Sequence, residues 1–222
     1  AAVAFLAGQA YAADVVFTNI TGTWFDPTPN SSITSNTGGG TANTQIRWDA
    51  SGYNFAAASS VNVIVPPAPS TTFSLGVFEH INQPVFASIS GVSLRVNADV
   101  TVDAVSVGQQ AFEFRFNHEE TSNDGTCAYG GANSQGVNIN GCADRVSVSF
   151  SNASDSFLVG ADQYTLNIVG FFNAGSQVSS FLTAEQQTNT AQLLANVSLR
   201  SDVVSAVPEP GTYALLFAGL AA

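Results

Sequence analysis

Apolar and polar residues alternate along three stretches of the chain. In the longest, residues 92–102, every second residue is apolar, and Ser, Arg, Asn, Asp and Thr stand between them. The same period of two recurs over residues 112–116 and 146–150. Because successive side chains of a β-strand point to opposite faces, each stretch predicts a strand with one buried and one solvated face.

Weaker strand candidates occupy much of the remaining chain. A helix is an alternative only in residues 183–194, whose centre is polar, and residues 27–43, rich in Asn, Ser and Gly, predict an exposed loop. Short strands separated by Gly, Asn and Pro predict an all-β fold, an antiparallel β-sandwich of jelly-roll type spanning residues 13–201. The weaker candidates are residues 15–24, 44–48, 61–65, 72–78, 164–171 and 195–203.

The net charge of the chain limits the kinds of partner that it can bind. The 222-residue chain has a formal net charge of -11, with five Arg and no Lys against 16 acidic residues. Such a chain repels phosphate backbones and anionic lipid headgroups, so we expect no nucleic acid partner. The length of the predicted domain suits a single hydrophobic core.

Both ends of the chain resemble export signals. Val207-Pro208-Glu209-Pro210 precedes the apolar run 213–222 and resembles the PEP-CTERM sorting signal of bacterial surface proteins. That resemblance implies processing by an exosortase, contact with the membrane only through a C-terminal transmembrane helix, and residues 202–206 as a linker. Ten residues are too few to span a bilayer, and the arginine cluster of the family is missing, so we expect the sequence to stop inside the membrane segment.

The N-terminal end agrees with export. Residues 1–12 read as the remnant of a signal peptide, with Ala10-Tyr11-Ala12 as the signal peptidase site. Together the two ends predict an exported protein in the cell envelope or extracellular matrix of a Gram-negative bacterium. Cys127 and Cys142 then predict one disulfide, which for a loop of this size contributes about 3 kcal/mol of stability.

The body of the chain has its own resemblance, over residues 17–144. Phe78-Glu79-His80-Ile81-Asn82-Gln83-Pro84 is followed by His118-Glu119-Glu120-Thr121-Ser122-Asn123 and by the cysteine-bounded loop. This order is similar to the THxN and choice-of-anchor K group of PEP-CTERM proteins. The resemblance implies an exported β-domain of uncharacterised molecular activity.

Two interpretations of these polar residues remain open. Strand parity places His118 on the inward face with Phe112, Phe114 and Phe116, and His80, Asn82 and His118 are expected to bond main-chain groups at strand ends. Alternatively, oxygen donors near the disulfide form a calcium site, since Ca²⁺ prefers carboxylate and amide oxygens. The candidate calcium ligands are Glu119, Glu120, Asn123, Asp124 and Asp144, with Asn138 or Asn140.

No catalytic constellation stands out. The chain has no G-x-S-x-G motif, and its two histidines do not have the spacing of zinc ligands. We therefore expect a non-enzymatic surface or biofilm-matrix protein, without cofactor unless calcium binds. A polysaccharide hydrolase is the alternative, in which Glu119 or Glu120 works with a second carboxylate such as Glu79 or Asp144. Extracellular polysaccharide is a candidate partner, because Trp24, Trp48, Tyr53 and Tyr129 could stack on sugars, although such aromatics commonly belong to the core.

Overall fold

The computed structural model describes residues 12–65, 69–148 and 154–201. The predicted linker and sorting signal lie outside these residues, as does all of the predicted signal peptide except Ala12. Among the described residues, no helix has the length and apolar character needed to cross a membrane.

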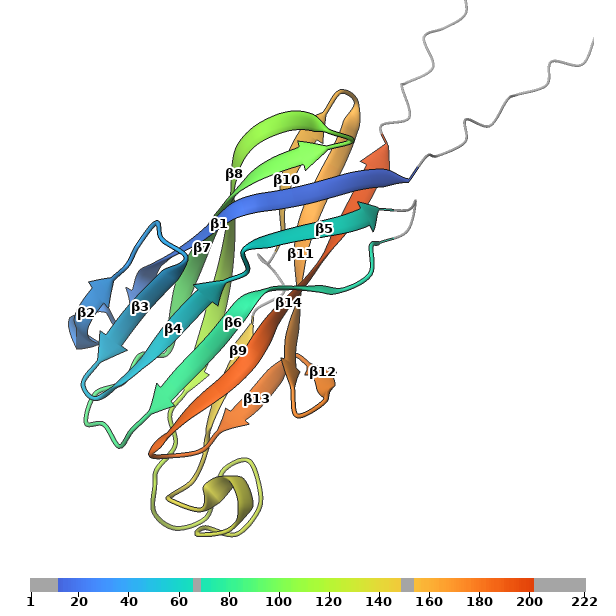
Figure 1. Ribbon diagram of the computed structural model, residues 1–222. Helices are drawn as coiled ribbons and strands as arrows, with labels where there is room; N and C mark the ends of the chain where they lie inside the picture. The colour runs from blue at the N-terminus through green and yellow to red at the C-terminus, as the bar shows by residue number, and fades with distance from the viewer. Residues whose placement is uncertain (1–11, 66–68, 149–153, 202–222) are drawn as a thin grey trace, which may run out of the picture.

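Two antiparallel sheets build the described part of the chain (Figure 1). The first, sheet A, has the order β13-β9-β8-β7-β1-β5, with β1 (Ala13–Thr28), β5 (Ser60–Val65), β7 (Gly91–Val102), β8 (Val105–Glu119), β9 (Asp144–Val148) and β13 (Ser180–Thr183). The second, sheet B, has the order β10-β11-β14-β6-β4-β3-β2. Its strands are β2 (Ile33–Thr37), β3 (Asn43–Trp48), β4 (Ser51–Ala57), β6 (Phe73–Asn82), β10 (Ser154–Val159), β11 (Asp162–Asn173) and β14 (Gln187–Ser201). The short β12 (Ser176–Val178) pairs with β11. The described residues also contain two 3₁₀ turns, η1 (Asn30–Ser32) and η2 (Gly136–Asn138).

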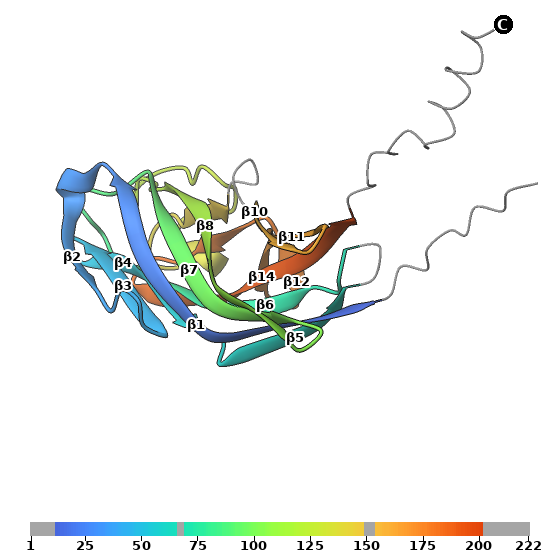
Figure 2. The same ribbon diagram turned by 90° about the horizontal axis from the view of Figure 1, so that it is seen from above.

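The two sheets curl around a common interior (Figure 2). This interior is rich in aromatic side chains. Alternating residues of β1, β6, β8 and β11 fill it, as the period of two predicts. The rings of Phe78 and Phe116 stack across the sheets at 5.1 Å between centroids, and Trp24 and Phe171 contact Phe116 from two sides. We call Trp24, Phe78, Phe116 and Phe171 the aromatic core. Their contacts hold the two sheets together.

The strictly alternating stretches are strands, as predicted. Residues 92–102 lie in β7, residues 112–116 in β8, and the described part of 146–150 in β9. The all-β prediction is therefore confirmed at the level of two antiparallel sheets.

The helix considered as an alternative for residues 183–194 is absent, and the loop predicted over residues 27–43 is only partly correct. Residues 183–194 contain no helix in the structure, because β14 begins at Gln187 and bonds to β6 on one edge and β11 on the other. Residues 27–43 are not a simple loop, since they contain the end of β1, the turn η1 and all of β2, which pairs with β3. In both places the pairing with neighbouring strands outweighs a weak local pattern.

The predicted disulfide between Cys127 and Cys142 is present, with 5.0 Å between the two Cα atoms. It closes the long connection between β8 and β9, which forms the lower end of the molecule in Figure 1. Glu120 and Asn123 precede this connection's first cysteine and Asp144 follows its second, so the disulfide holds these polar residues near one end of both sheets.

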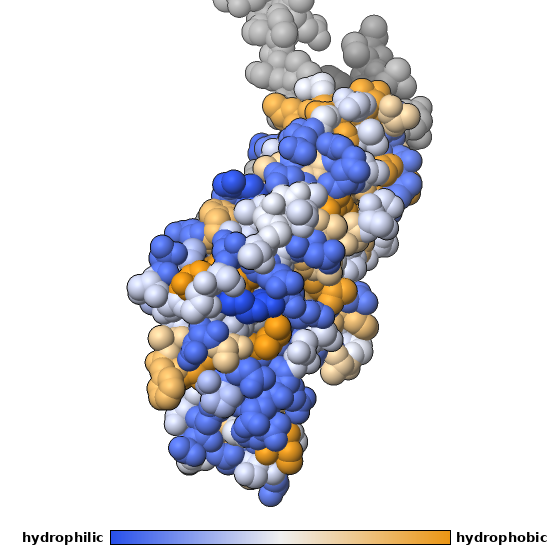
Figure 3. Space-filling model, turned by 60° about the vertical axis from the view of Figure 1, so that its left-hand side comes forward, coloured by the Kyte–Doolittle hydropathy of each residue, from blue (hydrophilic) through white to orange (hydrophobic). Residues whose placement is uncertain are grey.

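The outer surface is mainly hydrophilic on the face shown in Figure 3, with apolar residues scattered across it. Ion pairs on the outside are exposed, as for Arg95 and Glu113, whose side chains are 44% and 47% accessible. Such pairs add little to stability, so the fold depends on its interior.

Candidate metal centre

The inward faces of β6 and β8 change from aromatic to polar at the same end of the molecule. On β6, Phe78 is followed by His80 and Asn82, and on β8, Phe116 is followed by His118. Both histidines are buried, and their ring centroids lie 5.0 Å apart. Two strands from opposite sheets thus bring together two imidazoles that are far apart in the sequence.

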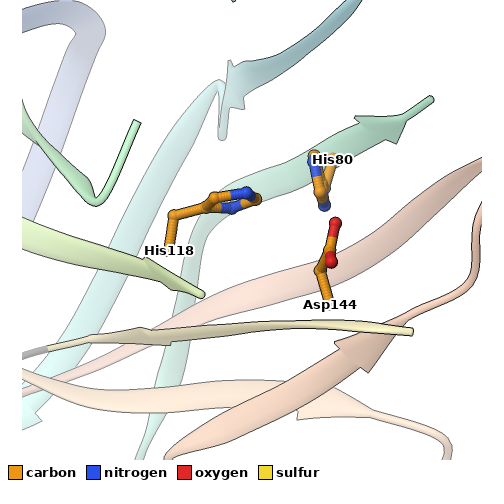
Figure 4. A group of neighbouring side chains, drawn as sticks. All are labelled: His80, His118 and Asp144. Carbon is orange, nitrogen blue, oxygen red and sulfur yellow. The ribbon is translucent and has the colours of Figure 1, made fainter. Parts of the chain in front are cut away.

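Asp144 joins these two rings from β9. The antiparallel register pairs Glu119 with Arg145 and His118 with Val146, which places the first residue of β9 beside the end of β8. Potential ligand atoms of His80, His118 and Asp144 all lie within 4.8 Å of one another. Figure 4 shows a ring nitrogen of His80 facing the Asp144 carboxylate, with His118 approaching from another side.

Asp144 also belongs to a second group, formed by three carboxylates. Oxygens of Glu120, Asp144 and Glu185 lie within 4.8 Å of one another. Glu185 sits in the turn that leads from β13 in sheet A to β14 in sheet B, and its side chain has no exposed surface. The two groups share Asp144, and we call their five residues, His80, His118, Glu120, Asp144 and Glu185, the polar cluster.

Hydrogen bonds fix the orientation of both histidines. Nδ1 of His80 lies 2.9 Å from the Thr183 hydroxyl, which also lies 3.4 Å from the carbonyl oxygen of Asp144, and this arrangement favours the tautomer with the proton on Nδ1. In that tautomer Nε2 of His80 carries a lone pair. Nδ1 of His118 lies 2.6 Å from the Tyr53 hydroxyl, and Nε2 of His118 lies 3.2 Å from a carboxylate oxygen of Glu120.

Several buried acceptor atoms around the cluster have no hydrogen-bond partner. They are Nε2 of His80, Oδ2 of Asp144, both carboxylate oxygens of Glu185, Oδ1 of Asn82 and Oδ1 of Asn123. Buried polar groups are almost always paired, because leaving one unpaired costs about 1–3 kcal/mol. A bound cation would satisfy such a set of unpaired acceptors.

Burial and mutual repulsion shift the pKa values of the cluster. Burial, with a contribution from Glu120, raises the pKa of Asp144 to about 6. Burial, with Asp144 and Glu120 adding, raises the pKa of Glu185 to about 7; the amides of Asn82 and Asn123 oppose this rise without completing a hydrogen bond to it. Burial, followed by repulsion from His118, holds the pKa of His80 well below its usual range, which keeps this ring neutral.

The structure separates the predicted calcium ligands. Glu120 and Asp144 lie in the cluster, and the buried Oδ1 of Asn123 faces Gly141, where an added Cβ would meet it at 2.7 Å. Glu119 points outward instead, where it accepts hydrogen bonds from Arg145 and Tyr129, while Asp124 is exposed and belongs to neither group. Glu119 and Glu120 are adjacent at the end of a strand and therefore face opposite sides, so only Glu120 is directed to the cluster.

The prediction that the polar motif residues pin strand ends holds only for Asn82, which donates to the main-chain oxygen of Thr183. The ring nitrogens of the two histidines contact side chains. Asn138, an alternative ligand, donates to Gly130 O and accepts from Ala143 N. Asn140 donates to the carbonyl of Glu185, so both stabilise the loop.

Three of the four aromatic residues considered for sugar stacking are in the interior. Trp24, Trp48 and Tyr53 are at most 1% exposed, so they belong to the core, as is common for such aromatics, and cannot stack on sugars. Tyr129 is half-buried, and its ring already lies under the guanidinium of Arg145 at 4.6 Å.

Sequence reasoning missed Glu185, Thr183 and the role of Tyr53. Glu185 is the only carboxylate between Asp162 and Asp202, and it stands two residues after Thr183, so an isolated acid beside a strand end was the available signal. That signal does not reveal which residues of other strands it meets. The sequence matches no protein-family model and no curated protein.

Proposed function

We propose that this protein is a non-enzymatic β-sandwich module that binds a divalent cation in the polar cluster between its sheets. The observation that carries the proposal is the convergence of unpaired, buried acceptor atoms from His80, Asp144 and Glu185. Three carboxylates gather there, and the four ion pairs found among the described residues place no arginine on them. Buried charges of one sign need a counter-charge, which a bound cation supplies.

A structural role fits the burial better than hydrolysis does. Asp144, Glu185 and His80 are each 0% exposed, so a polysaccharide chain has no access to them. Glu119, one of the acids considered for hydrolysis, is held by Arg145 and Tyr129. The alternative of a polysaccharide hydrolase would need an open cleft that contains two of these acids.

Export remains part of the proposal. The PEP-CTERM-like sequence Val207-Pro208-Glu209-Pro210, the signal-peptide-like residues 1–12 and the disulfide all agree with an oxidising compartment outside the cytoplasm. We propose delivery to the envelope or matrix of a Gram-negative bacterium, with signal peptidase and an exosortase as processing partners. Fractionation of cells that express the full-length gene product, with and without Pro208→Ala and Glu209→Ala, tests this: retention of normal surface delivery by the double variant would contradict it.

Extracellular polysaccharide is the proposed matrix partner. A shallow pocket on sheet B is lined by amides and a carboxylate, groups that hydrogen-bond sugar hydroxyls. Arg47 donates to Asn54, which in turn donates to Glu79, so these side chains are held in place. Affinity electrophoresis in exopolysaccharide gels should show retardation that Asn54→Ala reduces; equal mobility in gels with and without polysaccharide would exclude this partner. The residues lining the pocket are Asn43, Thr44, Gln45, Asn54, Phe55, Ala56 and Glu79.

We also propose that the two sheets form a jelly roll. The chain passes repeatedly between them, since β1 lies in sheet A, β2 to β4 in sheet B, β5 in sheet A and β6 in sheet B. A strand order determined experimentally that lacks paired Greek keys would exclude that topology.

The cation is tested by titration. Protein stripped with a chelator is titrated with Ca²⁺, Mg²⁺, Mn²⁺ and Zn²⁺ in turn, and heat of binding and melting temperature are recorded. At least one ion should bind saturably and stabilise the fold, by about 2.7 kcal/mol at 100 times its Kd. Asp144→Asn, which alters the carboxylate shared by both groups, should abolish the effect. If none of the ions binds, the proposed function is wrong.

A further inference from the structure

We infer, resting on the proposed function, that the cation is a first-row transition metal of the zinc class. Its ligands are His80, His118, Asp144 and Glu185. This assignment goes beyond a generic divalent site, because it names the donor atoms and excludes calcium as the resident ion.

Donor chemistry selects the class of ion. Ca²⁺ binds six to eight oxygen atoms, whereas imidazole nitrogen suits Zn²⁺ and its neighbours in the first transition row. The cluster offers one imidazole from each sheet beside Asp144, and both rings are buried. Two nitrogens with carboxylate oxygens form a ligand set that zinc commonly uses.

The rings are already oriented for metal binding. A metal-bound histidine usually donates its second N–H to another group, which fixes the tautomer. For His80 this second group is the Thr183 hydroxyl, which accepts from Nδ1. The lone pair of Nε2 is then without a partner inside the cluster. For His118, Tyr53 lies at Nδ1 and Glu120 at Nε2, so metal binding through Nε2 uses the neutral tautomer in which Nδ1 carries the proton and donates it to the Tyr53 hydroxyl oxygen.

Charge and burial indicate a closed site. A divalent ion with Asp144 and Glu185 ionised and two neutral imidazoles has no net charge, which suits a buried position. Glu185 is the fourth ligand because both its oxygens are buried and unpaired, whereas Glu120 is half-buried and already contacts His118. Tetrahedral ligands at about 2.1 Å from zinc lie about 3.4 Å from one another, whereas the potential ligand atoms within each group of three lie within 4.8 Å, so the two groups must contract around Asp144, and Glu185 must approach the histidines, to complete the site.

The position of the ligands makes the ion a cross-link between the sheets. His80 comes from β6 of sheet B, while His118 and Asp144 come from β8 and β9 of sheet A. Glu185 lies in the turn that connects the sheets. At this end of the interior, polar side chains replace the aromatic core. A bound ion would hold the two sheets together there.

The first experiment uses the wild-type protein, so it does not depend on any variant folding. Chelator-stripped protein is titrated with Co²⁺, and its visible absorption is recorded, followed by displacement with Zn²⁺. We expect a saturable d–d spectrum, displacement at one equivalent of Zn²⁺, and no displacement by Ca²⁺ at a hundredfold excess. X-ray absorption at the zinc edge should then show two imidazole ligands and oxygen donors.

Variants identify the ligands. His80→Gln, His118→Gln and Glu185→Gln should each weaken Zn²⁺ binding about 100-fold or more, since removal of a partner beyond the ligands already costs about 10–100-fold. Thr183→Val removes the hydroxyl that contacts the His80 ring and the Asp144 carbonyl but no proposed ligand, so its effect should fall within that smaller range. Glu119→Gln is the matched control, because its side chain is adjacent in sequence but faces Arg145, and it should leave Zn²⁺ affinity unchanged.

The outcomes separate this inference from the proposed function. Binding of Ca²⁺ but not of Zn²⁺ or Co²⁺ would keep a cation site and overturn the transition-metal assignment. Zinc bound without imidazole in the absorption spectrum, or with full affinity in His80→Gln, would also overturn it. Loss of zinc affinity in Glu120→Gln but not in Glu185→Gln would refute the fourth ligand. If no ion of any kind binds, both the proposed function and this inference fail.

Discussion

The aromatic core and the polar cluster occupy the same interior and are carried by the same strands. On β8, Phe112, Phe114 and Phe116 face inward and His118 continues that row, and on β6 the row changes from Phe78 to His80. The core is held by ring contacts that need nothing else, such as the stacked Phe78 and Phe116. The cluster leaves its acceptor atoms unpaired. Strand parity therefore decides what is buried, whereas residue chemistry decides whether the buried group is satisfied within the chain.

Damage to the core should have the largest effect. Phe116→Ala removes a buried ring that contacts Trp24, Phe78 and Phe171, so the free energy of unfolding should fall by about 3–5 kcal/mol. Urea unfolding in the presence of a chelator measures this loss without any metal contribution. The control, Phe172→Ala, alters a ring that is 42% exposed and should cost under about 1 kcal/mol. Equal losses in the two variants would contradict the ring-packing account.

Opening the disulfide beside the polar cluster should have the second-largest effect. Cys127→Ser opens the disulfide with Cys142, and the stability of the metal-free protein should fall by about 3 kcal/mol, because the unfolded chain regains the freedom of the closed loop. Differential scanning calorimetry of the oxidised proteins gives the comparison. Treatment of the wild-type protein with a reductant should reproduce the loss, and an unchanged melting temperature in the variant would rule out a stabilising disulfide.

The two regions should also differ in pH response. In the unfolded chain the carboxyls of Asp144 and Glu185 titrate near pH 4. In the folded state the pKa is about 6 for Asp144 and about 7 for Glu185. Between the unfolded and the folded pKa of each group, the folded state therefore binds more protons than the unfolded chain. The stabilisation is complete below about pH 4 and is lost as pH rises through 6 and 7, on the order of 2 kcal/mol in metal-free protein.

Chemical unfolding at pH 4.5, 6 and 8 with a chelator present measures that slope. Asp144→Asn combined with Glu185→Gln should reduce this pH dependence, and saturating Zn²⁺ should raise the stability of the wild-type protein at pH 8. A stability of the metal-free wild-type protein that rises from pH 4.5 to 8 would contradict the folded pKa values.

The smallest effect should come from Tyr53→Phe. The change keeps the buried ring among Trp24, Trp48 and Phe78 but removes the hydroxyl that lies 2.6 Å from Nδ1 of His118, so stability should fall by about 1 kcal/mol. Thermal unfolding detects this. Tyr129→Phe, whose hydroxyl bonds the half-buried Glu119, is the comparison and should cost less. A larger loss for Tyr129→Phe would argue against the importance of the buried hydrogen bond.

The sequence predicted the parts of the fold that have strong local alternation, such as β7 and β8. It missed β2, β4, β10, β12 and β13, because these short segments have no sustained period of two and become strands through their neighbours. At the site, parity correctly turned His118 inward. It could not show that His80 and Glu185 arrive at the same point, since that depends on the pairing of β6 with β14 and on the path between the sheets.

The position of β14 has a mechanical consequence. Residues 187–195 pair with β6 and residues 192–201 pair with β11, so both edges of this strand are bonded. Ladder hydrogen bonds run across the strands, and tension applied along β14 from its C-terminal end would have to shear many of them at once. Glu185 stands just before the other end of this strand. An ion held there would anchor the strand at the point farthest from the pull, and extraction of β14 would require breaking the metal site as well as the sheet.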